Sequence, residues 1–294
     1  MNVLVIGASG FIGSSLVGQL SVRNRVLGTF CNRAVRGLVR LDMRNIGEIE
    51  DVARSFHPHV ILVSAANPNV EYCEEHRDET WETNVKGTEN VAKIAQRVEA
   101  KLVYFSSDYV FDGKDGPYGE GDTPNPISAY GKQKLASEEL VRQMLEDHLV
   151  VRTTVVYGWE AEEKNFVMRM IRRLRNGHSM RVPNDQVGTP TYVDNLAAAV
   201  TELIEKDKQR TYHIVGPDLL DRYSFAKVVA EVFSLNPELL IPVPTSELGQ
   251  KARRPLKAGL KTAKAQRELE TQLVGVREGL ATVKRNLERT SIDV

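Results

Sequence analysis

The chain has 294 residues with 39 Lys or Arg and 39 Asp or Glu, so its formal net charge is zero. This balance, with 41% hydrophobic residues, is typical of a globular protein and excludes a general nucleic-acid or membrane-surface binder. Two cysteines, Cys31 and Cys73, without a CxxC exclude a disulfide framework and favour the cytoplasm. Residues 1–7 carry no basic leader, so we expect no signal peptide, and no apolar run approaches the ~20 residues of a membrane span.

Short apolar runs alternate with helix-like segments in the first half of the chain. Continuous apolar runs favour strands that are buried on both faces of a parallel sheet. We predict strands at residues 3–6, 26–30, 59–64, 101–105 and 149–156, and helices at 11–20, 46–56, 81–98 and 129–145. This alternation predicts an α/β fold, a Rossmann-type doubly wound parallel sheet.

The pattern is looser after about residue 157. We predict helices at 166–175, 193–205 and 223–235, a strand at 211–215 and an extended segment at 240–244. Val276, Leu280, Val283 and Leu287 form a helical face that covers this region or a dimer partner. We therefore expect two units, a cofactor-binding domain at 1–157 and a smaller, interwoven substrate lobe at 158–294.

A glycine-rich turn, GASGFIG, follows the first predicted strand and opens a helix. Glycines allow a tight turn, and backbone N–H groups at the helix start can approach a pyrophosphate. The strand before and the helix after are the context that a dinucleotide site requires, whereas a plain strand–helix turn is the other interpretation. The residues expected at the cofactor are Gly7, Ser9, Gly10, Phe11, Ile12 and Gly13.

The residues after the second strand bear on the choice of dinucleotide. An NAD site usually carries an acidic residue there, but this chain has Asn32 and Arg33. A guanidinium suits a 2′-phosphate, so we predict NADP(H), with NAD(H) as the other candidate and a solvated surface arginine as the alternative for Arg33. Asp42 and its neighbour Met43 are assigned to the same site, Asp42 as an acceptor for the adenine amino group.

Tyr130 and Lys134 form a YxxxK pattern, which places both side chains on one face of a helix. A neighbouring ammonium favours the phenolate and should lower the pKa of the tyrosine toward neutral pH. Ser106 and Ser107 follow an apolar strand upstream, and a hydroxyl there can bond a substrate carbonyl oxygen. The three groups together predict acid–base chemistry at a carbonyl.

With these motifs in place, the chain resembles the extended short-chain dehydrogenases/reductases, and among them the dTDP-4-dehydrorhamnose reductase family. The resemblance runs from residue 1 to about 260. The stretches that carry it are GASGFIG (7–13), FSSDYVFDG (105–113), PYGEGDTPNPISAYGKQK (117–134), RTTVVYG (152–158), NFV (165–167), DQVGTPTYVDNLA (185–197) and RRP (253–255).

The resemblance implies reduction of a nucleotide-sugar C4 ketone by hydride transfer. It assigns the catalytic roles to Ser107, Tyr130 and Lys134, with Tyr130 as the acid and Lys134 also holding the nicotinamide ribose. It adds Ala65, Ala66, Asn84 and Ser106 to the cofactor site, with Asn84 supporting the lysine through water. It assigns the nucleotide sugar to Asp108, Tyr109, Val110, Asn165, Phe166, Val187 and Arg254.

Some features leave the substrate and the role open. Val155 stands where the rhamnose reductases carry a tryptophan, which puts the sugar's identity in doubt. Arg254 is assigned to the diphosphate, and a plain surface role is the alternative. The histidines show no HxH or HExxH spacing, so we predict no metal site. Family members are often dimers, so a homodimer is compatible with the resemblance.

Two other functions remain as alternatives. The regulatory β subunit of methionine adenosyltransferase also resembles this chain, including an SSDYVFDG stretch, and acts as a non-catalytic, NADP-binding subunit. Epimerases and dehydratases belong to the wider group. Dehydratases add an acidic pair at the hydroxyl site, whereas here Asp108 is followed by Tyr109.

Overall fold

The computed structural model describes residues 1–292, with side chains described as far as Arg289. Its central sheet has seven strands in the order β11-β6-β5-β4-β1-β2-β3, and each neighbouring pair is parallel. The strands are β1 (Asn2–Ile6), β2 (Arg25–Phe30), β3 (Val39–Arg40), β4 (Val60–Val63), β5 (Lys101–Ser107), β6 (His148–Thr153) and β11 (Arg210–His213). The predicted doubly wound Rossmann-type sheet is confirmed.

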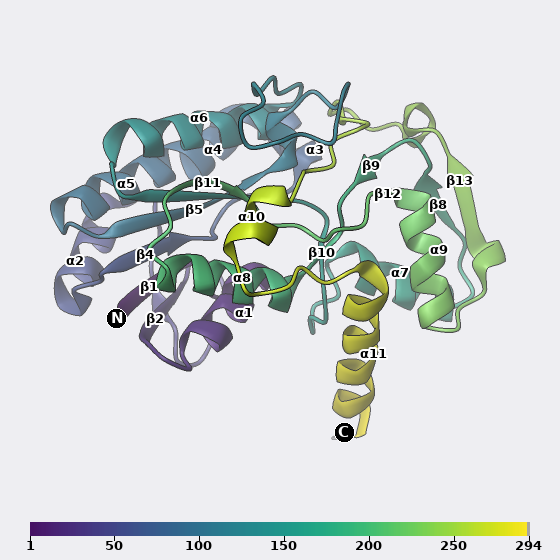
Figure 1. The fold of residues 1–294 in the computed structure, drawn as a ribbon, viewed down its shortest axis with the longest axis horizontal. Helices are drawn as coiled ribbons and strands as arrows, with labels where there is room; N and C mark the ends of the chain where they lie inside the picture. The colour runs from purple at the N-terminus through teal and green to yellow at the C-terminus, as the bar shows by residue number, and fades with distance from the viewer. Residues whose placement is uncertain (293–294) are drawn as a thin grey trace.

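Helices cover both faces of this sheet (Figure 1). Side chains alternate along β1, so that Val3 and Val5 pack into one core and Leu4 and Ile6 into the other. The first core includes α1 (Phe11–Leu20), α8 (Val193–Glu205) and α10 (Ala263–Glu268). The second includes α2 (Ile46–Phe56), α5 (Gly87–Arg97) and α6 (Ala129–Met144). Because all strands run the same way, their carboxyl ends share one edge of the sheet, where the connecting loops place functional side chains.

A further hydrophobic core lies beside the sheet and contains Tyr157, Phe225 and Leu280. It is built by α7 (Phe166–Arg175), α9 (Arg222–Val232), α11 (Val276–Ile292) and the paired strands β8 (Met180–Pro183) and β13 (Leu240–Val243). Short pairs complete this side, β7 (Val156–Tyr157) with β10 (Thr191–Tyr192) and β9 (Val187–Gly188) with β12 (Leu220–Asp221). Short 3-10 turns are η2 (Asp108–Val110), η3 (Pro237–Leu239) and η4 (Thr245–Leu248).

The chain crosses between these two parts more than once. β11 and α8 come from beyond residue 158, yet β11 pairs with β6 at the end of the main sheet and α8 packs on α1. The predicted boundary between a cofactor domain at 1–157 and a substrate lobe at 158–294 therefore stays a prediction about which part binds which ligand. Residues 293–294 of the predicted lobe lie outside the described residues.

One predicted strand is wrong in its extent. Residues 149–156 do not form a single strand, because β6 ends at Thr153 and Val155 has a φ of +45°. A β-branched residue in the left-handed region is strained, so the surroundings must hold it there. Thr191 does so, since its hydroxyl donates to the Thr154 carbonyl at 2.8 Å and its N–H to the Val155 carbonyl at 3.2 Å.

The predicted helix at 81–98 is also wrong in its extent and regularity. The helical segment begins earlier than predicted, with α4 (Arg77–Trp81). It continues as a π-helical turn, η1 (Glu82–Lys86), and ends with α5. α3 (Val70–Glu75), α10 and the strands β3, β8, β9, β10 and β12 were not predicted, because elements of two to six residues carry too little periodicity. The other predicted elements are confirmed, with ends that shift by at most three residues.

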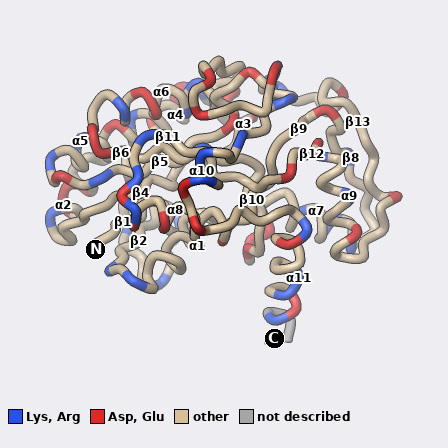
Figure 2. Tube along the Cα trace, viewed as in Figure 1, with Lys and Arg blue, Asp and Glu red and all other residues tan. Residues whose placement is uncertain are grey.

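No helix among the described residues is both long and apolar enough to span a bilayer. Figure 2 shows acidic and basic residues interspersed over the outer helices of both parts.

Candidate active site

The predicted catalytic residues meet where β5 ends and α6 begins. Ser107 is the last residue of β5, and its hydroxyl donates to Asp108 at 2.9 Å. α6 starts one residue before Tyr130, because the Ser128 side chain caps it by accepting from the Gly131 N–H at 3.2 Å. Tyr130 and Ser107 therefore both lie at the carboxyl edge of the sheet, next to the same buried acid.

Lys134 lies one helical turn after Tyr130 and is almost fully buried. Its ammonium donates to the Phe105 carbonyl at 2.8 Å and lies 5.8 Å from the centre of the Tyr130 ring. Burial lowers the pKa of Lys134 to about 8. The lysine thus contacts the tyrosine through its ring face.

The expected lowering of the tyrosine pKa is wrong in this structure. Burial, followed by the nearby acid Asp108, raises the pKa of Tyr130 well above its ordinary value, and the Ser107 side chain opposes only part of this rise. Tyr130 therefore keeps its proton at neutral pH. That state suits a group that donates a proton to a developing alkoxide.

Asp108 itself is an unusual acid. It is 4% exposed, and burial raises the pKa of its carboxyl to about 6, although bonds from Thr154 and Ser107 oppose the rise. A carboxyl of this kind, which changes charge near neutral pH beside a pocket, is typical of functional sites.

Tyr109 joins the catalytic tyrosine to Arg254. Its ring meets the ring of Tyr130 edge-on at 5.6 Å between centroids, and its hydroxyl accepts from Arg254 at 3.1 Å. Arg254 also pairs with Glu71, at 2.6 Å. Glu71 lies in α3, and the sequence carries no signal for this contact because the two residues are 183 positions apart.

The glycine turn between β1 and α1 is tightly packed. Gly7 has a φ of +89°, and a Cβ on Gly13 would lie 2.2 Å from the Gly7 carbonyl oxygen. No side chain caps the start of α1 at Gly10, so its first N–H groups remain available to a phosphate. This cradle fits a dinucleotide. Ser9 is exposed at the turn, whereas Phe11 and Ile12 are partly buried against the core beside the sheet.

The residues after β2 that are predicted to bind the cofactor differ in how far their side chains already bond to other residues. Arg33 is 68% exposed and forms an ion pair with Glu162. Asp42 is already bonded at both carboxylate oxygens by Arg44, so its proposed bond to an adenine would have to compete with this pair. Asn32 accepts from the Cys31 thiol, and Met43 is buried against Gly87.

Other predicted cofactor residues lie around the same edge. The Ala65 N–H donates to the Ile6 carbonyl, and Ala66 follows it in the loop after β4. Asn84 lies in the π-helical turn, where its side chain accepts from the Asn67 N–H at 2.7 Å and donates to Gln133 at 2.8 Å. Such turns recur at functional sites. Ser106 is buried near Glu138, whose pKa its hydroxyl helps to lower.

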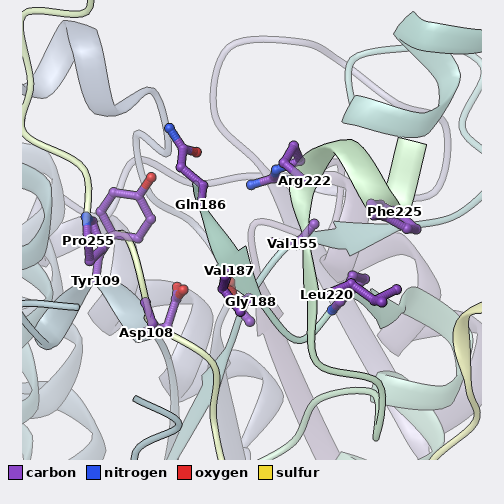
Figure 3. Close-up of a pocket in the computed structure, with 13 residues that line it drawn as sticks. Asp108, Tyr109, Val155, Gln186, Val187, Gly188, Leu220, Arg222, Phe225 and Pro255 are labelled. Carbon is purple, nitrogen blue, oxygen red and sulfur yellow. The ribbon is translucent and has the colours of Figure 1, made fainter. Parts of the chain in front are cut away.

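A pocket opens beside the catalytic residues (Figure 3). Of the predicted substrate residues, Asp108, Tyr109 and Val187 line it, and Val155 lies in its wall. The lining residues that the sequence did not indicate are Thr154, Gln186, Gly188, Pro190, Leu220, Arg222, Phe225, Pro255 and Ala258. Gln186 lies within the DQVGTPTYVDNLA stretch, so the family motif could have indicated it as a substrate residue. Arg222 lies in none of the family motifs.

Four predicted substrate residues, Arg254 among them, are absent from the lining. The Val110 side chain is fully buried in a small core with Phe111. Asn165 caps α7 by accepting from the N–H groups of Val167 and Met168. Phe166 lies behind the pocket wall, with its ring centre 5.8 Å from that of Phe225.

A family model, the RmlD substrate binding domain, matches residues 1–289. The chain belongs to this family. It is similar in structure to dTDP-4-dehydrorhamnose reductase from Bacillus anthracis, solved with NADP, with a TM-score of 0.89 and 32% identity over 97% of this chain and 99% of that one.

Curated relatives of this RmlD-family chain point in two directions. Spore coat polysaccharide biosynthesis protein SpsK of Bacillus subtilis is 34% identical and is matched over 86% of this chain and 87% of its own length. Methionine adenosyltransferase 2 subunit beta of Bos taurus is 32% identical, over 94% of this chain and 84% of its own. The family is thus shared by reductases and by a named subunit of another enzyme.

Proposed function

We propose that the chain is an NADPH-dependent reductase of the C4 ketone of a nucleotide-activated sugar. The observation that carries this proposal is that Ser107 and a protonated Tyr130 converge next to Asp108 and Tyr109, which line a pocket, at the end of the sheet where the glycine turn also lies. The similarity to a reductase solved with NADP supports it. In this proposal residues 1–157 bind the cofactor and 158–294 supply the substrate lobe, and the protein acts in the cytoplasm.

When bound, NADPH supplies the hydride. Gly7, Gly10 and Gly13 would hold its pyrophosphate at the start of α1, and Lys134 would hold its nicotinamide ribose. Ser107 turns its hydroxyl from Asp108, which it bonds in this structure, to donate to the substrate oxygen, and Tyr130 gives its proton to that oxygen as negative charge develops there. Preplaced donors aimed at one oxygen stabilise the transition state more than the ground state.

NADPH oxidation tests this function. We would follow absorbance at saturating NADPH with dTDP-4-keto-rhamnose and a panel of other 4-keto nucleotide sugars. Turnover of at least one sugar is expected, and the replacement of the family tryptophan by Val155 makes the preferred sugar an outcome of the panel. Tight NADP binding without turnover of any sugar would overturn the proposal.

Arg33 tests the cofactor preference. Because its guanidinium suits a 2′-phosphate, Arg33→Ala should raise the KM for NADPH about tenfold, which corresponds to ~1.4 kcal/mol, and leave the KM for NADH within twofold. Steady-state kinetics with both cofactors measure this, with Arg36→Ala as the matched surface control. Equal changes for the two cofactors would remove Arg33 from the 2′-phosphate site.

A non-catalytic regulatory role is the second candidate, supported by the 94% coverage in the match to methionine adenosyltransferase 2 subunit beta. The catalytic set of Ser107, Tyr130 and Lys134 is complete here, which favours the enzyme. Two results together would favour the regulatory role. The chain would co-purify with a methionine adenosyltransferase, and substitutions of Ser107 and Tyr130 would leave the activity of that assembly unchanged.

A further inference from the structure

One arginine, Arg222, lines the substrate pocket, and a second, Arg254, contacts the lining residue Tyr109 from outside the lining. The two differ in whether their charge is already paired. Arg254, the residue that the sequence assigns to the diphosphate, is 12% exposed at its side chain and already has a carboxylate partner in Glu71. Its second nitrogen is bonded to the Tyr109 hydroxyl. A ligand anion would have to compete with Glu71 for its charge, although the buried Nε of Arg254 has no hydrogen-bond partner among the described residues.

Arg222 is held in place without such a partner. It is the first residue of α9, and its backbone N–H donates to the Gln186 carbonyl at 2.9 Å. Its guanidinium carbon lies 5.1 Å from the centre of the Phe166 ring, so the aromatic face supports the side chain. Within the part of the chain that the structure describes, no carboxylate lies within 4 Å of its guanidinium nitrogens.

The charged groups around Arg222 leave it without a direct ion pair among the described residues. Figure 3 shows its side chain reaching from α9 toward Gln186 across the pocket. Among the lining residues it is the one base and Asp108 is the one acid, and Asp108 is bonded to Ser107 instead. Burial lowers the pKa of the Arg222 guanidinium, Tyr109 and Asp108 oppose this lowering, and the charges of Arg254 and Arg169 add to it. A guanidinium stays charged and is costly to bury unpaired.

We propose that Arg222, and not Arg254, binds an anionic group of the substrate in this pocket, and that Arg254 is a positioning residue that holds Tyr109 against Tyr130. The planar fork of Arg222 pairs two oxygens of one phosphoryl or carboxylate group. This inference rests on the proposed function, because it names the part of the nucleotide sugar that the pocket recognises.

Ligand binding to the NADP-saturated protein tests the inference without turnover. Calorimetric titration with thymidine diphosphate, thymidine, UDP-glucuronate and UDP-glucose separates a phosphoryl from a carboxylate partner. If the partner of Arg222 is a phosphoryl group, Arg222→Gln should weaken the binding of thymidine diphosphate at least tenfold and leave the affinity for thymidine unchanged. If the partner is a sugar carboxylate, the same variant should lower the preference for UDP-glucuronate over UDP-glucose tenfold.

Matched variants make the outcome specific. Lys227→Gln removes an exposed cation from the same helix, and Arg254→Gln removes the paired arginine; each should change these affinities less than threefold. Arg254→Gln should instead lower kcat with little change in the KM for substrate. Arg222→Lys keeps the positive charge but lacks the planar guanidinium, and it should bind the anionic ligand at least threefold more weakly. This variant tests the role of Arg222 if the glutamine variant does not fold.

Unchanged affinity for both ligand pairs in Arg222→Gln, or a larger loss in Arg254→Gln, would overturn this inference. Intact ligand binding with no NADPH oxidation would overturn the proposed reductase function instead.

Discussion

Tyr130→Phe should lower kcat for NADPH oxidation by roughly 10²- to 10⁴-fold, the usual contribution of a positioned general acid. The phenol is the proton donor of the proposed reaction, and burial keeps it protonated at neutral pH. Removing one oxygen leaves the ring, and with it the edge-on contact to Tyr109, in place. NADP affinity, measured by titration of the free protein, should change less than about twofold because the glycine turn is untouched.

The control for this variant is Tyr223→Phe, since Tyr223 is partly buried against the core beside the sheet, away from Tyr130. It should retain full activity. Activity of Tyr130→Phe within threefold of the original would show that another group supplies the proton, and Asp108, with a pKa of about 6, would be the first to examine.

Glu138→Ala should destabilise the fold by about 3–5 kcal/mol, because it leaves a buried arginine without its partner. Glu138 and Arg152 are fully or almost fully buried and form two bonds, of 2.8 and 2.7 Å. Burial raises the pKa of Glu138, but the bond and charge of Arg152 hold it below its usual value. The pair also ties α6, which carries Tyr130 and Lys134, to β6.

Denaturant unfolding measures this effect. Glu50→Ala removes the exposed i,i+4 pair with Arg54 and should cost less than about 1 kcal/mol. The double variant Glu138→Leu/Arg152→Met should recover much of the loss, because paired hydrophobic residues need no neutralisation. A single-variant loss below about 1 kcal/mol would mean that water reaches and solvates the Arg152 guanidinium in the variant.

The motifs within one strand–turn–helix unit could be predicted because their physics is local. The glycine turn after β1 and the YxxxK face of α6 depend on residues within about ten positions of each other, and the structure places them as expected. The strand break at Val155 could not be predicted. Nothing in 149–156 disfavours a continuous strand, and the contact that holds the turn comes from Thr191.

By itself the sequence determined the fold class and the family, and it predicted the acid–base residues, because apolar periodicity and short motifs are properties of neighbouring residues. Only the tertiary structure decided how those residues are tuned and which charges remain for a ligand. Burial raises the pKa of Tyr130, where the sequence predicted lowering by Lys134. Glu71 pairs with Arg254, whereas Arg222 lines the pocket without a direct ion pair among the described residues, and Asp108 is the other charged residue of the lining. Both outcomes depend on side chains that meet only after the chain folds.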